Sequence, residues 1–506
     1  MVSVFSISYI LGFFEKVLYY NKIMKAFRKL LFTIAFLSSL IITDVRVYAV
    51  NTVPSAEQKS AAEDRKFLPV ESNTWQGWPE GPALGAEAAV LMDFNTGTVL
   101  YSKNIHEELY PASTTKMMTA LLTIENTTMD EIVTFSHDAI FNVESDSSRI
   151  GIDVGEQMTV EQCLYGLMLG SANEVAYALA EHVGGSLEGF VNMMNERALA
   201  LGCNNTHFIN ANGHPDENHY TSAYDLALIA RECYKNEAFA NISGTRTFTI
   251  PATNIQSQER IMDNHHLMVH GFKYQYDGFI GGKTGYTRDA RQTLVSCAER
   301  NGLRLICVIM KEESPDQFLD TQKLFDYGFD GFQILNVKDN ETRYTLDSST
   351  FFKTDLDIMG SSRQALELND TGYVIIPKTA SFDDLNVELD YSDGSDGYVA
   401  TLNYYYETNN VGSTTLDYAQ TERDVFEFAN IIRSASDGTQ PKAFSKNKNI
   451  VFVNVRRIII IMAIILGTLL ILLFIRSFVL SYSYSGRHQK NLKKKRYKKR
   501  KKNMRL

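Results

Sequence analysis

Cysteine is scarce in this sequence. The chain has only five cysteines among 506 residues, an odd number, and no two of them form a C-x-x-C pair. This argues against a disulfide framework and against a structural zinc site. Cys297 and Cys307 flank Asn301-Gly302, a dipeptide typical of a two-residue hairpin turn. Such a turn pairs Cys297 with Ile306, so the two sulfur atoms point to opposite faces of the sheet. We therefore expect five buried free thiols.

A phosphate-binding loop and a clustered set of metal ligands are also absent. Gly282-Lys283-Thr284 matches the end of the G-x-x-x-x-G-K-[ST] pattern, but Asp277 occupies the position of its first glycine. His265, His266 and His270 lie close together, yet no carboxylate or cysteine nearby completes a known zinc spacing. The sequence therefore predicts no metal and no cofactor.

Positive charge is depleted in the middle of the chain. The formal net charge is -9, but the ends carry +4 before Asn51, +3 at Arg456, Arg457 and Arg476, and +12 from Arg487 onward. This leaves about -28 for the middle of the chain. An acidic soluble body stays dispersed and repels nucleic acid, so we expect no nucleic-acid partner. The length suffices for two globular domains with additional segments.

Long apolar runs are few, and the first lies near the N-terminus. A basic cluster over 25–29 precedes an apolar run over 30–42, and Val47-Tyr48-Ala49 then offers small residues for cleavage. This arrangement predicts a secretory signal peptide within 1–49, with cleavage after the last of these residues. A membrane-spanning helix is the alternative, but the apolar run is short for that role. Met24, directly before the basic cluster, is a candidate start of translation.

The second apolar run lies near the C-terminus and contains no charged residue over 458–475. At about 1.5 Å per residue a helix of this length reaches about 27 Å, close to the hydrocarbon thickness of a bilayer. We expect a transmembrane helix over 456–478, preceded by a polar stalk over 433–455. The positive-inside rule places the basic tail over 479–506 in the cytoplasm, where it can contact anionic lipids. Nucleic-acid binding by the tail is the competing interpretation. The predicted location is the cell membrane, with one span and an exported body.

Between these ends the sequence divides into three parts. Residues 50–82 are polar with scattered prolines, and we interpret them as a linker. Residues 83–332 contain helical patterns between pairs of strands, which favours an α+β fold with an antiparallel sheet and a helical cluster over repeated βαβ units. Residues 333–432 are rich in Asp, Thr, Ser and Tyr with alternating polarity, which predicts a small all-β domain.

Several elements can be placed within the α+β part. The expected strands lie over 88–92, 98–101, 279–285 and a hairpin over 293–310, and the expected helices begin near Ser113 and cover 160–183.

The first motif that carries chemistry is Ser113-Thr114-Thr115-Lys116. On a helix, side chains three residues apart share one face. A serine hydroxyl becomes a nucleophile when a neighbour takes its proton, and a lysine can do so once burial or a nearby cation lowers its pKa. Apolar residues follow Lys116, and Lys283 is the candidate cation. A helix start at Ser113 also places its N–H where an oxyanion would form. The pattern alone is weak, because Ser445–Lys448 matches it too, and a solvated helix face is the alternative.

The second motif is Ser171-Ala172-Asn173, which interrupts an apolar helical stretch. Polar residues at such a point need partners. A turn between two helices that places Ser171 and Asn173 in a cleft would supply them. The alternative is an ordinary pair of helix-capping residues.

The third motif is Lys283-Thr284-Gly285, preceded by two further glycines. Glycines in a strand allow another chain to approach closely, and Lys283 with Thr284 can hold an anionic group such as a substrate carboxylate. An exposed hairpin is the alternative for this motif by itself. His214 and His219 lie in a loop rich in Gly and Asn, where we expect solvent exposure, with a place along the cleft as the other option.

These three motifs, in this order, resemble those of the serine D-alanyl-D-alanine carboxypeptidases, the low-molecular-mass penicillin-binding proteins. The resemblance extends from about residue 87 to residue 332 and implies the fold shared by serine β-lactamases and DD-peptidases. The segment after Gly331 resembles the C-terminal module of the same family. Longer matches support the likeness at Tyr110–Ala112, Gly155–Val160, Met193–Glu196 and Pro215–Ala223.

The resemblance implies a role for each motif residue. Ser113 would form an acyl-enzyme with the penultimate D-alanine of a peptidoglycan stem peptide and expel the terminal D-alanine. Lys116 would be the general base, and Ser171 and Asn173 would relay the proton and hold the peptide. β-Lactam antibiotics would acylate Ser113 in the same way, and no metal would take part.

The same resemblance implies that Lys283, Thr284, Gly285 and Tyr286 form the substrate-binding strand. Lys283 and Thr284 would bind the terminal carboxylate. The N–H groups of Ser113 and Tyr286 would form the oxyanion hole.

Two features depart from the family pattern. Ala172 stands where the family commonly has glycine, and a C-terminal span replaces the usual amphipathic anchor. Two other functions stay open from the sequence. A β-lactamase shares the catalytic logic but needs fast deacylation, and a non-catalytic cell-wall binding protein could retain the fold.

Overall fold

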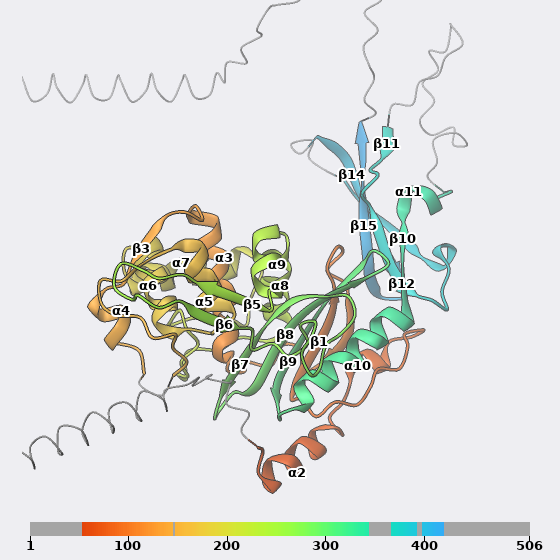
Figure 1. Ribbon diagram of the computed structural model, residues 1–506. Helices are drawn as coiled ribbons and strands as arrows, with labels where there is room; N and C mark the ends of the chain where they lie inside the picture. Colours follow the sequence, from red (N-terminus) through yellow and green to blue (C-terminus); the bar gives the residue numbers. More distant parts are fainter. Residues whose placement is uncertain (1–52, 145–146, 344–365, 392–396, 419–506) are drawn as a thin grey trace, which may run out of the picture. The chain divides into compact units, whose positions relative to one another are not determined.

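The computed structural model describes residues 53–144, 147–343, 366–391 and 397–418 (Figure 1). The expected signal peptide, stalk, transmembrane helix and basic tail lie outside these ranges. Within them, no helix combines the length and the apolar character that a membrane span requires.

The centre of the fold is a five-stranded antiparallel sheet with the order β2-β1-β9-β8-β7. The antiparallel arrangement predicted from the sequence is therefore confirmed. The strand that carries the third motif, β7, lies at one edge of this sheet. The five strands are β1 Ala88–Asp93, β2 Val99–Lys103, β7 Phe279–Thr287, β8 Arg291–Arg300 and β9 Leu303–Glu312.

The β8–β9 hairpin has the predicted register. Cys297 lies opposite Ile306, and the turn residues Asn301 and Gly302 have φ angles of 51° and 81°. Positive φ at both positions is the conformation that a two-residue hairpin turn requires. Cys297 belongs to the apolar core on one face of the sheet and Cys307 to the core on the other. All five cysteines are buried and free, as predicted.

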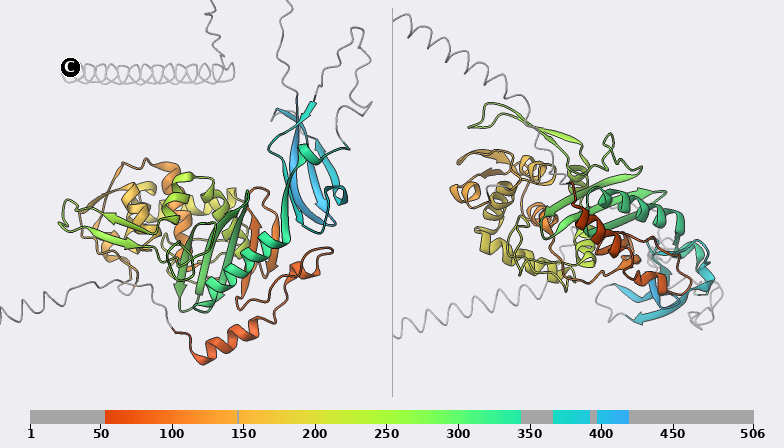
Figure 2. Two further views of the ribbon diagram at one scale, coloured as in Figure 1. Left: turned by 45° about the vertical axis from the view of Figure 1, so that its right-hand side comes forward. Right: turned by 90° about the horizontal axis from the view of Figure 1, so that it is seen from below.

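The two faces of the sheet are covered by different helices. Figure 2 shows a cluster of helices on one side and α10, Asp316–Gly331, on the other. Successive side chains of β1 point to opposite faces of the sheet and so contribute to two apolar cores. Val90 and Met92 face the helical cluster, whereas Leu91 faces α10. The cluster contains α3 Lys116–Asn126, α4 His137–Phe141, α5 Val160–Met168, α6 Asn173–Gly184, α7 Leu187–Ala200, α8 Ala223–Tyr234 and α9 Glu237–Gly244, with the small sheets β3 Ile132–Thr134 with β4 Gln157–Thr159 and β5 Thr247–Ile250 with β6 Arg260–Asp263.

The region after α10 forms a second antiparallel sheet of six strands. Its order is β10-β12-β15-β14-β13, with β11 paired to β15. Among the described residues of this region, the short helix α11 Val337–Asn340 and the 3-10 turn Phe382–Asp384 interrupt the strands. The strands are β10 Phe332–Asn336, β11 Leu366–Leu368, β12 Tyr373–Pro377, β13 Asn386–Tyr391, β14 Tyr398–Tyr406 and β15 Asn409–Tyr418.

The structure describes residues 53–82 of the expected linker over 50–82, and this part is folded. It contains the helix α2 Ala56–Arg65 and the 3-10 turn Glu71–Thr74, and Trp78 is only 8% exposed. The Trp78 indole N–H donates to the carbonyl of Leu100 at 2.7 Å, so the segment packs against β2. Burial of the tryptophan is the physical reason, because fully burying a large side chain stabilises the fold by about 1.5–3 kcal/mol.

Candidate active site

The first motif forms a tight turn that leads into α3. Ser113 lies in a 3-10 turn, Ala112–Thr115, and the α-helix begins at Lys116. The Nζ atom of Lys116 is 3.0 Å from Ser113 Oγ and donates to the carbonyl of Asn212 at 2.6 Å. Ser113 is partly exposed, whereas Lys116 is 0% exposed. The turn thus presents the hydroxyl to solvent and keeps the amine inside.

Burial changes the acid–base behaviour of Lys116. Loss of hydration lowers the pKa of its amine well below the usual value, and the positive charge of Lys283 lowers this pKa further. The carboxylates of Glu174 and Glu144 act in the opposite direction. Because its pKa is depressed, Lys116 can hold a neutral amine beside a serine hydroxyl, which is the arrangement that serine activation needs.

Two glycines let other segments approach the nucleophile closely. A Cβ on Gly213 would lie 1.8 Å from the carbonyl oxygen of Ala112, and one on Gly285 would lie 3.1 Å from Ser113 N. The prediction that glycine in β7 permits close approach is therefore confirmed. Ala112 itself has a φ of 50°, a left-handed conformation that costs a non-glycine residue about 1–2 kcal/mol. Strain at this position fits a backbone that must aim the adjacent hydroxyl.

The second motif is the turn between α5 and α6, so the predicted helix–helix turn is confirmed. Ser171 has a φ of 55°, and its Oγ accepts a hydrogen bond from Lys283 Nζ at 3.1 Å. Asn173 begins α6 and is 8% exposed, and its Oδ1 has no hydrogen-bond partner among the described residues. An acceptor left free in this way is available to a ligand.

The third motif lies at the edge of the sheet. Lys283 is 1% exposed and also donates to the carbonyl of Thr284 at 2.9 Å. Burial lowers the pKa of its amine to about 7. Gly285 is buried against the Ser113 turn, whereas Thr284 and Tyr286 are partly exposed. The structure therefore brings all three motifs together around two buried amines.

One histidine was misjudged from the sequence. His219 is 0% exposed rather than solvated, and its Nε2 lies 2.9 Å from Thr115 Oγ1. The N–H of Ile209 donates to Nδ1 at 3.1 Å, so the proton of the neutral ring lies on Nε2 and is donated to Thr115. Burial lowers the pKa of His219 to about 3, which keeps the ring neutral. The stretch over 215–223, which resembles the carboxypeptidase family, was the sequence feature that could have indicated a place for His219 near the active site.

The other histidines differ from one another. His266 is buried behind β7, and its Nε2 is 2.9 Å from Ser296 Oγ. His214 is half-exposed, and its Nδ1 lies 3.4 Å from Glu144 Oε1. Within the ranges that the structure describes, no three His, Cys, Asp or Glu side chains are grouped to hold a metal ion.

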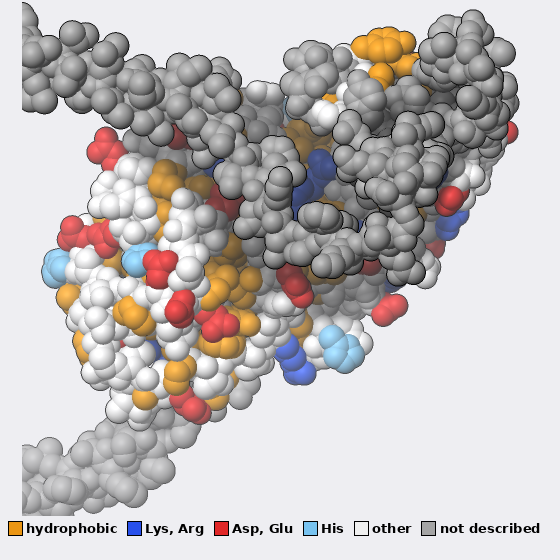
Figure 3. All heavy atoms as spheres, turned by 90° about the horizontal axis from the view of Figure 1, so that it is seen from above, with side chains coloured by type: hydrophobic (Ala, Val, Ile, Leu, Met, Phe, Trp, Pro, Cys, Tyr) orange, Lys and Arg blue, Asp and Glu red, His pale blue; other side chains and the backbone are white. Residues whose placement is uncertain are grey.

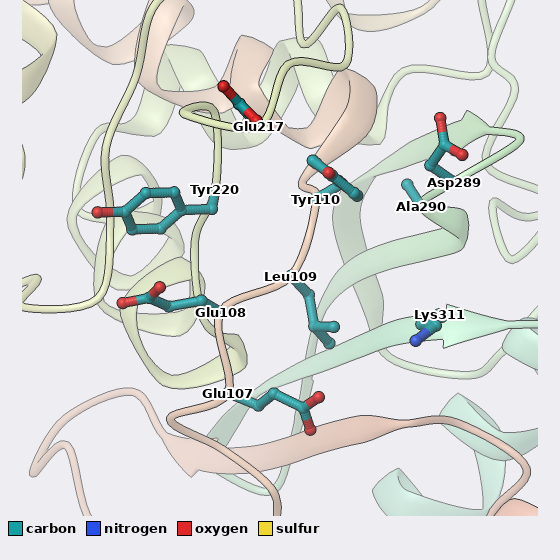
Figure 4. Close-up of a pocket in the computed structure, with 9 residues that line it drawn as sticks. All are labelled: Glu107, Glu108, Leu109, Tyr110, Glu217, Tyr220, Asp289, Ala290 and Lys311. Atoms are coloured by element: carbon teal, nitrogen blue, oxygen red, sulfur yellow. The ribbon is translucent and has the colours of Figure 1, made fainter.

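A cavity of about 340 Å³ lies beside the segment that leads into Ser113. Figure 4 shows Glu107 to Tyr110 on one side of it and Asp289 with Lys311 on the other. Its lining contains four carboxylates and one amine, and no motif in the sequence indicated this cavity. Acidic side chains are also scattered across the face drawn in Figure 3, where the described residues form no continuous basic patch. The lining residues are Glu107, Glu108, Leu109, Tyr110, Glu217, Tyr220, Asp289, Ala290 and Lys311.

Comparisons with known proteins agree with this geometry. The family described as D-alanyl-D-alanine carboxypeptidase matches residues 76–314. The D-alanyl-D-alanine carboxypeptidase DacF of Bacillus subtilis is 36% identical over 255 residues, which are 49% of this chain and 63% of the relative. The match therefore spans less than two thirds of that relative's length.

A second relative is covered more completely. The D-alanyl-D-alanine carboxypeptidase of a Streptomyces species is 33% identical over 258 residues, which are 49% of this chain and 88% of the relative. The crystal structure of penicillin-binding protein 6B from Escherichia coli has the same fold, with a TM-score of 0.51 and 24% identity over 67% of this chain and 97% of that one. The chain belongs to the D-alanyl-D-alanine carboxypeptidase family.

Proposed function

We propose that this protein is a serine D-alanyl-D-alanine carboxypeptidase that removes the terminal D-alanine from peptidoglycan stem peptides. The observation that carries this proposal is that each of two buried lysines contacts a serine of the motifs. Lys116 Nζ lies 3.0 Å from Ser113 Oγ, and Lys283 Nζ lies 3.1 Å from Ser171 Oγ. Both amines are buried, so one can act as a base while the other supplies positive charge when protonated.

Acylation uses the first pair. The Ser113 oxygen attacks the carbonyl carbon of the penultimate D-alanine, and its proton passes to the neutral amine of Lys116. The resulting oxyanion accepts hydrogen bonds from the N–H groups of Ser113 and Tyr286. When the C–N bond breaks, the proton passes through Ser171 to the nitrogen of the departing D-alanine.

Deacylation returns the enzyme to its starting state. Water attacks the ester carbonyl, Lys116 takes a proton from it, and the Ser113 oxygen recovers that proton as it leaves. The product is a peptide shortened by one D-alanine. A β-lactam would acylate the same serine, since its strained amide presents a carbonyl and a carboxylate to the same groups.

Substrate binding depends on the free edge of β7. Because β7 is the last strand in the order of its sheet, an extended peptide can pair with its outer edge. Lys283 and Thr284 would hold the terminal carboxylate, and Gly285 lets the peptide and the Ser113 turn meet. The Oδ1 of Asn173, which has no partner within the described part of the chain, would accept an N–H of the peptide.

For the membrane location, we propose a single-pass protein with the catalytic domain outside the cytoplasm. The support is the sequence alone: a signal-like region over 1–49, an uncharged apolar run over 458–475 and a basic tail over 479–506. The substrate class agrees with this placement, because peptidoglycan lies outside the cytoplasmic membrane.

Release of D-alanine tests the proposed function directly. The protein should release D-alanine from a peptide that ends in D-Ala-D-Ala, and a fluorescent penicillin should label it stably and stop the release. Ser113→Ala should abolish both labelling and release while leaving the melting temperature nearly unchanged, because only a hydroxyl is removed. Rapid turnover of the penicillin would instead indicate a β-lactamase. If the folded wild type shows no labelling and no release, the protein is a non-catalytic wall-binding protein.

A further inference from the structure

Glu174 is a buried carboxylate that the three motifs do not include. It follows Asn173 directly, is 1% exposed, and its Oε1 accepts a hydrogen bond from the backbone N–H of Ile150 at 2.7 Å. Its Oε2 is buried and has no hydrogen-bond partner among the described residues. Burying a carboxyl group with one oxygen unpaired costs free energy, which calls for a compensating role.

Glu174 holds the segment 148–150 through the N–H of Ile150, and this segment supports the second motif. Residue 148 contacts the motif directly, because its carbonyl accepts the N–H of Asn173 at 2.9 Å. The Ile150 side chain fills the space beside Gly166 and Gly170, where a Cβ on either glycine would lie 2.9 Å from it. The segment 148–150 therefore packs against the turn that contains Ser171, whose φ of 55° is a strained conformation.

The charges of the buried side chains also involve Glu174. The active site contains two buried amines, Lys116 and Lys283, and the charge of Lys283 disfavours a positive charge on Lys116. Glu174 is among the groups that favour a positive charge on Lys116. Burial raises the pKa of Glu174, whereas the Ile150 N–H and the Arg149 guanidinium favour its ionised form. The other titratable groups that act on Lys116 or lie near it are Lys283, Glu144 and His219.

We propose that Glu174 is a positioning residue of this active site, which fixes the 148–150 segment against the Ser171–Asn173 turn and supplies a negative charge to the buried amine of Lys116. This inference rests on the proposed function. In the acylation step the proton of Ser113 moves to Lys116, so the amine becomes charged as the new C–O bond forms. A carboxylate nearby stabilises that charge and thereby favours the transfer.

Two substitutions separate the two roles. Glu174→Gln keeps an oxygen that can accept the Ile150 N–H but removes the charge, and Glu174→Ala removes both. The matched control is Glu181→Gln on the same helix, where Glu181 Oε2 accepts from Ser136 Oγ at 2.7 Å. Acylation by a fluorescent penicillin is followed from pH 5 to pH 9, with a thermal melt of each variant.

The charge role predicts a change in the pH profile. Without the carboxylate, Lys116 loses its proton more readily, so the acidic limb of the profile moves to lower pH. The ratio of the Glu174→Gln rate to the wild-type rate should then be at least about threefold higher at pH 5 than at pH 9, which corresponds to half a pH unit. The Glu181→Gln profile should match that of the wild type. A Glu174→Gln profile that superimposes on the wild-type profile would overturn the charge role.

The bracing role predicts a difference between the two variants at pH 9. Glu174→Ala should be acylated at least about tenfold more slowly than Glu174→Gln, and equal rates would overturn this role. If Glu174→Ala does not fold, the Gln variant still decides the charge role. A wild-type protein that neither binds penicillin nor releases D-alanine would refute the proposed function itself, which is a different outcome from an unchanged variant.

Discussion

Gly213→Ala is the perturbation that best tests how the nucleophile is held. Gly213 has a φ of 87°, and a Cβ there would lie 1.8 Å from the carbonyl oxygen of Ala112 and 3.0 Å from Ser113 N. Real Cβ atoms essentially never lie within 3.0 Å of a backbone atom, so the Ala112–Ser113 backbone would have to move by about 1 Å. A displacement of that size at a reacting group can lower the rate about 100-fold.

Gly202→Ala is the matched control for this test. Gly202 has a φ of 84°, but nothing lies within 4 Å of the position of its Cβ. Both variants therefore pay the left-handed strain of about 1–2 kcal/mol, and only one disturbs the nucleophile. The assay is the second-order rate constant for acylation by a fluorescent penicillin, measured below the melting temperature of each variant. We expect a loss of about 100-fold for Gly213→Ala and no more than about twofold for Gly202→Ala. Equal rates in the two variants would show that the close approach of Gly213 does not position Ser113.

Two further perturbations test the binding strand and the N-terminal segment. Lys283→Met should raise KM for peptides with a free terminal carboxylate much more than for the corresponding amides, and equal effects on both would contradict carboxylate binding. Because burial lowers the pKa of Lys283 to about 7 from its ordinary 10.5, the unfolded chain retains a proton between these values that the folded protein has lost. The contribution of Lys283 to stability should therefore rise with pH over that window, and urea unfolding at pH 7 and pH 9 should show a steeper rise for the wild type than for Lys283→Met. Trp78→Ala should lower the unfolding free energy by about 3–5 kcal/mol, since the indole is buried against β2; a loss below about 1 kcal/mol would mean that residues 50–82 are a linker after all.

Local chemistry explains the parts of the fold that the sequence predicted well. Asn301 and Gly302 favour one turn type, and that turn sets the register of β8 and β9 and the opposite orientations of Cys297 and Cys307. The three-residue spacing of Ser113 and Lys116 likewise brings their side chains together through local geometry, even though Ser113 lies in a 3-10 turn.

Tertiary packing decides the parts that the sequence did not reveal. The polar composition of residues 50–82 hid a helix that is fixed by distant partners, since Lys103 Nζ donates to the carbonyl of Arg65 at 2.8 Å. His219 and Glu174 are polar residues in polar or mixed surroundings along the chain, and only the folded structure buries them beside the active site. Their partners, Thr115 and Ile150, are 104 and 24 residues away in the sequence.

The pH dependence of wild-type acylation reports the protonation of Lys116, on which the proposed mechanism depends. A buried amine with a depressed pKa is already neutral well below its ordinary value of 10.5, so the acylation rate should reach its plateau well before that pH. The experiment measures the second-order rate constant for a fluorescent penicillin from pH 5 to pH 11 at constant ionic strength. A rate that climbs tenfold per pH unit up to pH 10 would show an ordinary, charged lysine and would contradict the account.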